Sequence, residues 1–140
     1  PRGPSDALLG MSARCARALG PPPTPVEVLR SAALLHDIGK VGIPDAILHK
    51  PGPLTPEERE VMAEHPLIGE RILRSIGGFG AVADIVRHEH ESFDGGGYPD
   101  GIQGDRIPIG SRIIHACDSY HASACDTPYH KRVAHTEAVA

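Results

Sequence analysis

Apolar residues recur along most of the chain at intervals of three and four positions, which is the spacing of a helix with one buried face. Glycine and proline interrupt this pattern often enough to keep each helix short. The predicted helices cover 5–19, 25–35, 56–64, 66–76, 79–90 and 110–124. We therefore expect an all-α protein, a compact bundle of about six or seven helices.

Two of these helices begin with the sequence of a capping box, in which a threonine side chain and a glutamate three residues later satisfy main-chain amides. The two candidates are Thr24-Pro25-Val26-Glu27 and Thr55-Pro56-Glu57-Glu58. Pro66 fits the first turn of a further helix, where its missing amide hydrogen is not needed. Residues 94–101, which include three consecutive glycines, predict a shaped loop rather than a regular element.

The composition agrees with a helical bundle. Hydrophobic residues make up 40% of the chain and aromatic residues only 4%, so the core must consist of Leu, Ile, Val and Ala. A length of 140 residues suits a single domain over 1–140. The chain starts with Pro1 and stops where another helix begins to form, so we expect a fragment of a longer protein.

Charge and cysteine content argue against several classes of function. A formal net charge of -4 provides no large basic surface, so polymeric nucleic acid is not an expected partner. The cysteines are odd in number and lack a Cys-x-x-Cys pair, which predicts neither a disulfide framework nor a thiolate zinc site and suits the reducing cytoplasm. No apolar run reaches the ~18 residues of a membrane span, so we expect no direct membrane insertion.

Histidines and aspartates near the predicted helix ends are the candidate chemical groups. His36 and Asp37 place an imidazole beside a carboxylate, and a carboxylate can bridge two cations. His65 and His90 also lie beside helix ends, and Asp118 lies in an apolar stretch where an unpaired charge would be costly. Such a set is compatible with iron, manganese, zinc or nickel and does not distinguish among them.

Ordinary structural roles also account for each of these residues taken alone. A single histidine after an apolar run is more often a helix end than a metal ligand. The glycines at 95–97 are as consistent with an exposed turn as with a substrate-binding loop. His115 and His121 share a helical face with Asp118, which is compatible either with donors behind the metal ligands or with simple packing.

Three motifs that occur in a fixed order favour the metal-binding roles over the ordinary structural ones. They are His36-Asp37-Ile38-Gly39-Lys40, His65-Pro66-Leu67-Ile68-Gly69 and His90-Glu91-Ser92-Phe93-Asp94-Gly95-Gly96-Gly97-Tyr98-Pro99. Together they resemble the HD-GYP subgroup of the HD superfamily of metal-dependent phosphohydrolases, over nearly all of 31–129. The resemblance implies the HD-domain fold, a metal centre at the helix ends, hydrolysis of cyclic di-GMP, and a sensor or receiver domain elsewhere in the parent protein.

The resemblance also implies roles for individual residues. The positions that match metal ligands, enough for two divalent ions, are His36, Asp37, His65, His90 and Asp118. The positions that match substrate-binding residues are Lys40, Gly95, Gly97, Tyr98 and Pro99. Asp37 would bridge the ions and Lys40 would hold a phosphate, so these two are the expected catalytic residues. The fitting mechanism is in-line attack on phosphorus by a metal-bridging hydroxide.

The chain departs from the family pattern at several positions. Glu89 stands where the family usually has a second histidine, and it is a further candidate metal ligand. Pro4 falls about where a first-helix histidine would serve a third ion, so we expect two ions rather than three. Thr127 and His130 stand where arginines are usual, and His121 stands where an aspartate is usual.

These departures leave three hypotheses open. The domain hydrolyses cyclic di-GMP, hydrolyses another small phosphoester, or binds a nucleotide or a partner protein as a signalling module without catalysis. Lys40 and the intact Gly97-Tyr98-Pro99 favour the first hypothesis. Thr127 and His130 motivate the second, and Glu89 together with the missing first-helix ligands motivates the third.

Overall fold

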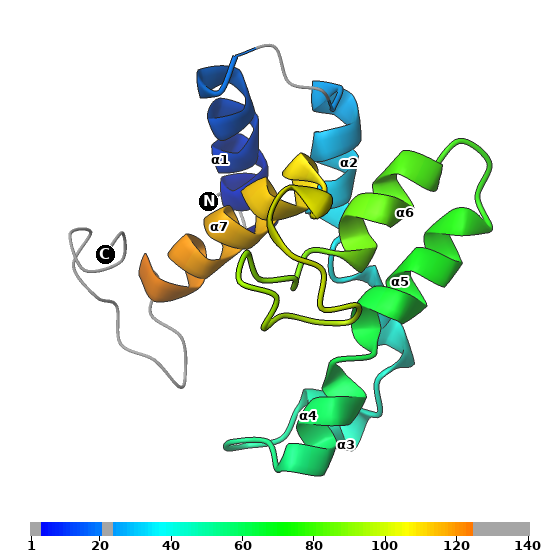
Figure 1. Cartoon of the computed structure of the whole chain (residues 1–140). Helices are drawn as coiled ribbons and strands as arrows, with labels where there is room; N and C mark the ends of the chain where they lie inside the picture. Colours follow the sequence, from blue (N-terminus) through cyan, green and yellow to red (C-terminus); the bar gives the residue numbers. More distant parts are fainter. Residues whose placement is uncertain (1–3, 21–23, 125–140) are drawn as a thin grey trace.

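The computed structural model describes residues 4–20 and 24–124, and in this part of the chain every regular element is helical (Figure 1). The α-helices are α1 (Pro4–Ala18), α2 (Val26–Leu35), α3 (Asp45–Leu48), α4 (Pro56–Met62), α5 (His65–Arg74), α6 (Gly80–Arg87) and α7 (Ile109–Ala124). Two 3-10 helices lie between them, η1 (Ile38–Gly42) and η2 (Gly104–Arg106). The expected all-α bundle of about six or seven helices is confirmed.

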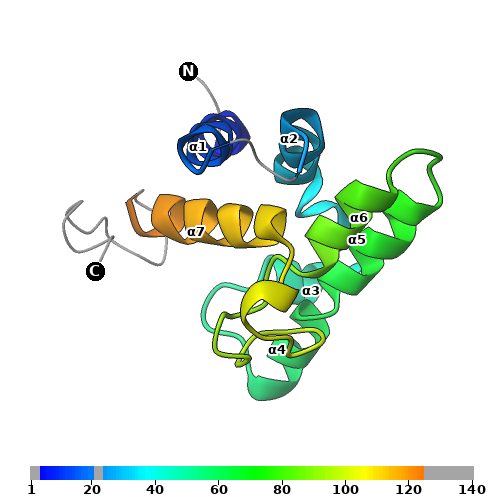
Figure 2. The same ribbon diagram turned by 45° about the horizontal axis from the view of Figure 1, so that its top comes forward.

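The helices form two packed groups joined through α2. Helices α1, α2 and α7 pack on one another, and α5 and α6 form a hairpin whose α6 packs on α2 (Figure 2). The short helices α3 and α4 contact each other and lie at the end of the molecule away from α1 (Figure 1). Because α2 contacts α6, the residues that follow these two helices can emerge close together.

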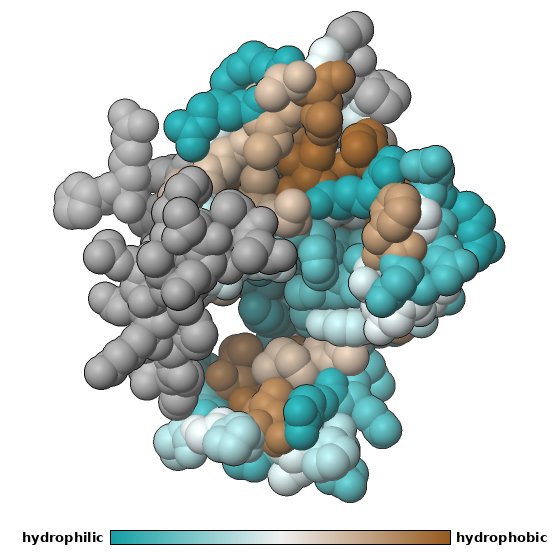
Figure 3. Space-filling model, turned by 60° about the vertical axis from the view of Figure 1, so that its left-hand side comes forward, coloured by the Kyte–Doolittle hydropathy of each residue, from teal (hydrophilic) through white to brown (hydrophobic). Residues whose placement is uncertain are grey.

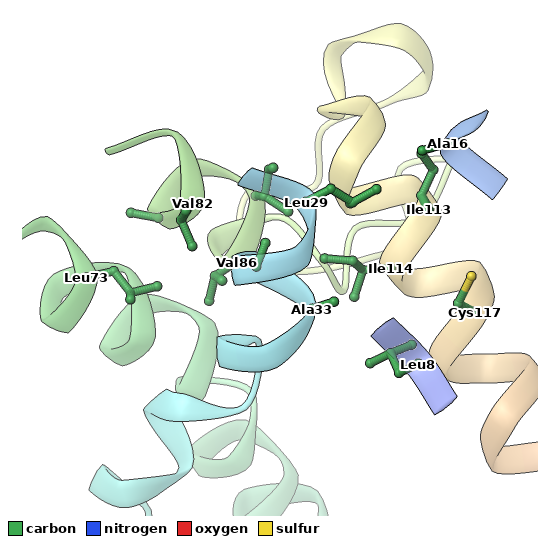
Figure 4. Packing of buried hydrophobic residues seen from close by; sticks show 13 residues of the cluster. Leu8, Ala16, Leu29, Ala33, Leu73, Val82, Val86, Ile113, Ile114 and Cys117 are labelled. Atoms are coloured by element: carbon green, nitrogen blue, oxygen red, sulfur yellow. The ribbon is translucent and has the colours of Figure 1, made fainter. Parts of the chain in front are cut away.

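Aliphatic side chains build the core, as the composition predicted. Leu29 of α2, Val86 of α6 and Ile114 of α7 are almost fully buried and belong to one cluster (Figure 4). Burying a side chain of this size contributes about 1.5–3 kcal/mol. The cluster therefore fixes α2, α6 and α7 against one another, and these helices precede or carry His36, His90 and Asp118.

One of the two predicted capping boxes is present. The Glu58 amide donates to Thr55 Oγ1 at 3.2 Å, and the Thr55 amide donates to Glu58 Oε2 at 2.7 Å. The prediction at Thr24 is wrong, because Pro25 itself occupies the position before α2 and no side chain caps that helix. With ψ at 137°, Pro25 is extended, so the helix starts one residue after the predicted position.

Some other boundaries and burial patterns also differ from the prediction. The helix expected over 79–90 ends at Arg87, because the chain turns there and the Glu91 amide donates to the His88 carbonyl at 3.1 Å. Leu34 and Ile76 are apolar residues within the predicted helices 25–35 and 66–76, yet they are 52% and 46% exposed. Figure 3 shows apolar residues reaching the surface near the top and near the bottom of one face, with hydrophilic residues between them. Within the described residues, no helix combines the length and apolarity needed to cross a bilayer.

A very close main-chain contact joins η1 to α5. A Cβ atom placed on Gly39 would lie 1.8 Å from the His65 carbonyl oxygen and 2.6 Å from the Gly69 amide nitrogen. No side chain larger than hydrogen fits there, so residue 39 must be glycine for η1 to reach α5. This contact brings the segment after α2 alongside the first turn of α5.

We predict that Gly39→Ala lowers the free energy of unfolding by roughly 1–3 kcal/mol, because main-chain atoms of α5 must move to admit the methyl group. Gly10→Ala is the matched control, since its Cβ would meet nothing within 4 Å and lies in a helix. The control should raise the free energy of unfolding by about 0.5–1 kcal/mol. Urea unfolding followed by circular dichroism measures both, and a wild-type midpoint for Gly39→Ala would refute the packing argument.

Candidate metal centre

The structure gathers the predicted ligands from four separate parts of the chain. His36 and Asp37 follow α2, and His65 is the first residue of α5. Glu89 and His90 lie in the turn after α6, and Asp118 lies within α7. His36, Glu89, His90 and Asp118 border one cavity, and His65 lies within 4.0 Å of Asp37, Glu89 and His90.

His65, Glu89 and His90 form a triangle of ligand atoms. Nε2 of His65 lies 3.2 Å from Nε2 of His90 and 3.4 Å from Oε1 of Glu89. The third side, from Oε1 of Glu89 to Nε2 of His90, is 3.6 Å. The point equidistant from these three atoms lies about 2.0 Å from each, which is the length of a bond from zinc to nitrogen or oxygen. The three atoms are therefore spaced as ligands of one ion would be.

Asp37 lies between two of the imidazoles. Its Oδ1 is 4.0 Å from Nε2 of His65, and its Oδ2 is 3.6 Å from Nε2 of His36. Lys40 Nζ is 2.7 Å from Oδ1. Burial raises the pKa of Asp37, but the Lys40 hydrogen bond and the charge of His36 outweigh it and hold that pKa below its usual value. Asp37 is thus kept ionised, with one oxygen towards each imidazole.

Main-chain carbonyls fix the ring nitrogens of three histidines. Nδ1 of His36 lies 3.0 Å from the Ala33 carbonyl, and Nδ1 of His65 lies 2.8 Å from the Met62 carbonyl. Nδ1 of His115 lies 2.8 Å from the Glu89 carbonyl. A carbonyl only accepts, so each Nδ1 carries the proton and each neutral ring keeps its lone pair on Nε2. This is the tautomer that a metal-binding Nε2 requires.

Glu89 is the most unusual group of the centre. Its residue is 2% exposed, and in the described structure neither carboxylate oxygen has a hydrogen-bond partner. Burial is the largest cause that raises the pKa of Glu89 well above its ordinary value; the charge of His36 opposes it, and the carboxylates of Asp37 and Asp118 add to it. A buried carboxyl group without a donor needs either a proton or a cation. Its surroundings therefore fit a bound metal ion.

His65 and His90, which lie beside Glu89, are in their metal-binding form at neutral pH. Burial lowers the pKa of His65, and burial together with the charges of His65 and His115 lowers the pKa of His90 to about 4. Neutral imidazole is the form that coordinates a metal. The adjacent cavity has a volume of about 50 Å³, which admits an ion or one or two waters but not a nucleotide. The donor set and the space both suit divalent cations.

The glycine-rich loop packs directly on this centre. The Tyr98 ring stacks on the His90 ring with centroids 5.0 Å apart, and the Tyr98 amide donates to the His90 carbonyl at 3.1 Å. A Cβ on Gly97 would lie 2.2 Å from the Ser92 amide nitrogen, and Gly95 has a φ of 86°. Both positions therefore need glycine for structural reasons. Contacts of Gly95, Gly97, Tyr98 and Pro99 with a substrate stay a prediction.

Polar contacts that the sequence did not reveal hold the far end of this loop. Arg87 donates from Nε and Nη2 to the two carboxylate oxygens of Asp100, each at 2.8 Å. Glu91 Oε1 accepts a hydrogen bond from the Asp100 amide at 2.7 Å. These pairs are 13 and 9 residues apart, so no local motif indicates them. Thr127 and His130, which we expected to alter substrate contacts, lie outside the described residues.

Comparison with known proteins agrees with this fold and these motifs. The profile of the family described as HD domain matches residues 2–140. A cyclic di-GMP phosphodiesterase of Thermotoga maritima is 45% identical over 121 residues, which cover 85% of this chain and 33% of that protein. The 3'3'-cGAMP-specific phosphodiesterase 3 of Vibrio cholerae is 44% identical over 101 residues, or 72% of this chain and 22% of that protein. The chain thus spans about a third of the length of such relatives or less.

A solved structure shares the arrangement of helices. Bd1817, a HDG"Y"P protein from Bdellovibrio bacteriovorus, matches with a TM-score of 0.66 at 21% identity, over 84% of this chain and 39% of that one. At this level of identity the likeness concerns the fold alone. Because the family profile covers all but one residue of the sequence and the fold is shared, the chain belongs to the HD domain family, in its HD-GYP subgroup.

Proposed function

We propose that this domain is a metal-dependent phosphodiesterase that hydrolyses cyclic di-GMP. The observation that carries the proposal is the triangle of His65, Glu89 and His90 beside the Asp37–Lys40 ion pair. Imidazoles, carboxylates and one lysine at a surface recess are the groups that metal-assisted phosphoester hydrolysis needs. The names of relatives at 41–45% identity support cyclic di-GMP as the substrate.

The metal ligands in this proposal are His36, Asp37, His65, His90 and Asp118, with Glu89 in addition. Asp37 suits the bridging role because its two oxygens face His36 and His65 separately. We propose two ions rather than three, because Pro4 opens α1 where a third ion would need a histidine. Imidazole and carboxylate ligands suit iron, manganese, zinc or nickel.

The divalent ions, when bound, would lower the pKa of a water for attack on phosphorus and neutralise charge on the phosphate oxygens. Asp37 holds Lys40 Nζ at 2.7 Å, and the Lys40 side chain is 37% exposed, so its ammonium group can meet a phosphate from solvent. Burial raises the pKa of Tyr98, which keeps its hydroxyl protonated as a donor. Gly95, Gly97, Tyr98 and Pro99 would place the loop beside the nucleotide.

A second substrate of the same class also has support. A relative 44% identical to this chain is named as specific for 3'3'-cGAMP, so the choice between cyclic dinucleotides needs a direct test. Loss of catalysis with retained ligand binding is the remaining alternative, motivated by Glu89. We place the domain in the cytoplasm, attached in its parent protein to a sensor or receiver domain.

The first test is elemental analysis of protein purified without added metal, followed by hydrolysis assays with manganese or iron supplied. We expect about two ions per chain and the highest kcat/KM for cyclic di-GMP among cyclic di-GMP, 3'3'-cGAMP and cyclic di-AMP. A higher value for 3'3'-cGAMP would identify the second substrate. Bound ions without turnover of any of the three would identify a signalling module.

Asp37→Asn should remove at least one ion and reduce hydrolysis by about 100-fold or more, because the amide keeps the shape but loses the charge that holds the cations. Asp45→Asn is the control, since the Asp45 side chain is 94% exposed and does not border the cavity. Chelation of wild-type protein should abolish the same activity. If hydrolysis fell in Asp37→Asn but survived chelation, the metal mechanism would be excluded.

Lys40→Met should lower kcat about 100- to 1,000-fold while the metal content stays at the wild-type value, because Lys40 neutralises phosphate and does not coordinate metal. Lys50→Met provides a control, since Lys50 pairs with Glu58 in the capping region of α4. Kinetics and elemental analysis are run on the same samples. If Lys40→Met lost as much metal as Asp37→Asn, the lysine would act through Asp37 instead of through the phosphate.

A further inference from the structure

His115 borders the same cavity as four of the proposed metal ligands. The ring of His115 lies on α7, one helical turn before Asp118, and is partly buried. Its centroid is 6.4 Å from that of His90, and the two rings are almost perpendicular at 82°. The cavity wall consists of His36, Glu89, His90, Ile114, His115, Asp118 and Ser119. His115 is therefore part of the centre in space, although it lies outside the three sequence motifs.

The hydrogen bond of His115 prepares it for coordination in the same way as His36 and His65. Each of these rings donates from Nδ1 to a main-chain carbonyl, at 2.8 Å for His115 and His65 and at 3.0 Å for His36. The lone pair of each neutral ring is then on Nε2. A fixed tautomer and a fixed ring plane are what an outer hydrogen bond gives a metal-binding histidine.

The carbonyl that holds His115 belongs to Glu89, whose buried carboxylate has no hydrogen-bond partner in the described structure. Glu89 thus contributes twice, with its main chain orienting His115 and its side chain bordering the cavity. An imidazole and an unpaired carboxylate on one small cavity of about 50 Å³ constitute two donors of the types that bind manganese, iron or zinc.

We infer that His115 is a further metal ligand, which binds through Nε2 the ion on the His36 and Asp118 side of Glu89. The inference rests on the proposed metal centre and adds to it an imidazole from α7. A ligand role would account for the hydrogen bond between the His115 ring and the carbonyl of Glu89, the residue that stands in place of a family histidine. The centre then draws two ligands from α7, His115 and Asp118.

The test compares metal binding by wild type, His115→Asn and His115→Ala. Asparagine places an amide near Nδ1 and can still donate to the Glu89 carbonyl, but it has no counterpart of Nε2. Titration with manganese gives the number of ions and their affinities, and the visible spectrum with cobalt reports changes of ligand and coordination number. His49→Ala is the control for loss of a histidine, since its side chain is 74% exposed and lies away from the cavity.

We expect both His115 variants to lose one ion or at least about 10-fold in affinity for it, with a changed cobalt spectrum, while His49→Ala behaves as wild type. Thermal melting of each metal-free variant checks that the fold persists. If His115→Asn keeps the wild-type stoichiometry, affinity and cobalt spectrum, His115 serves only to hold the Glu89 carbonyl and the inference is overturned.

Metal binding by His115 and hydrolysis of cyclic dinucleotides by the domain can be tested independently of each other. Wild-type protein that binds two ions without hydrolysing any cyclic dinucleotide, while His115→Asn binds one, supports the ligand and refutes the phosphodiesterase. Wild-type protein that hydrolyses cyclic di-GMP, while His115→Asn keeps both ions unchanged, supports the enzyme and refutes the ligand.

Discussion

The centre depends on the contact between η1 and α5, where two stretches of main chain meet without a side chain between them. Gly39 makes this contact possible, because any Cβ there would overlap the His65 carbonyl. The contact fixes His36 and Asp37, which come just before η1, next to His65, which opens α5. Interiors are packed too densely to tolerate a gap or an overlap at such a point. The approach of Asp37 to the His65 imidazole therefore depends on one glycine.

The second constraint is electrostatic. Asp37, Glu89 and Asp118 bring three carboxyl groups together, and Lys40 is the cation paired directly with one of them. The neighbouring imidazoles of His65 and His90 have lowered pKa values, so they supply little positive charge at neutral pH. Without cations, this cluster must keep Glu89 protonated or bear repulsion between carboxylates. Metal binding would displace that proton, so the affinity should be linked to pH and to folding.

The sequence predicted the helices and the motif residues because both are encoded locally. Apolar spacing located six helices, and the ordered motifs indicated His36, Asp37, His65 and His90, while Asp118 was indicated by its place in an apolar stretch and by the family resemblance. The sequence could not show the hydrogen bond of His115, since its partner is a carbonyl 26 residues away whose position depends on how α7 crosses the turn after α6. Thr24 misled the prediction because proline already held the position before α2. The hydrogen-bonded ion pair between Arg87 and Asp100 was also not predicted, because it joins the end of a helix to a loop.

The glycine-rich loop has two attachments of different kinds, and this difference bears on how substrate and metal are coupled. Its far end is held by Arg87 and Glu91, which contact Asp100 and are not among the proposed ligands. Its centre is held by Tyr98, whose ring stacks on His90. The loop thus has one attachment that involves no proposed ligand and a second one that packs directly on a proposed ligand. His90 therefore contacts both the loop, through Tyr98, and the other proposed ligands His65 and Glu89. Glu89 directly precedes His90 in the chain. The glutamate that replaces a family histidine therefore lies next to the residue that contacts both the loop and the other proposed ligands.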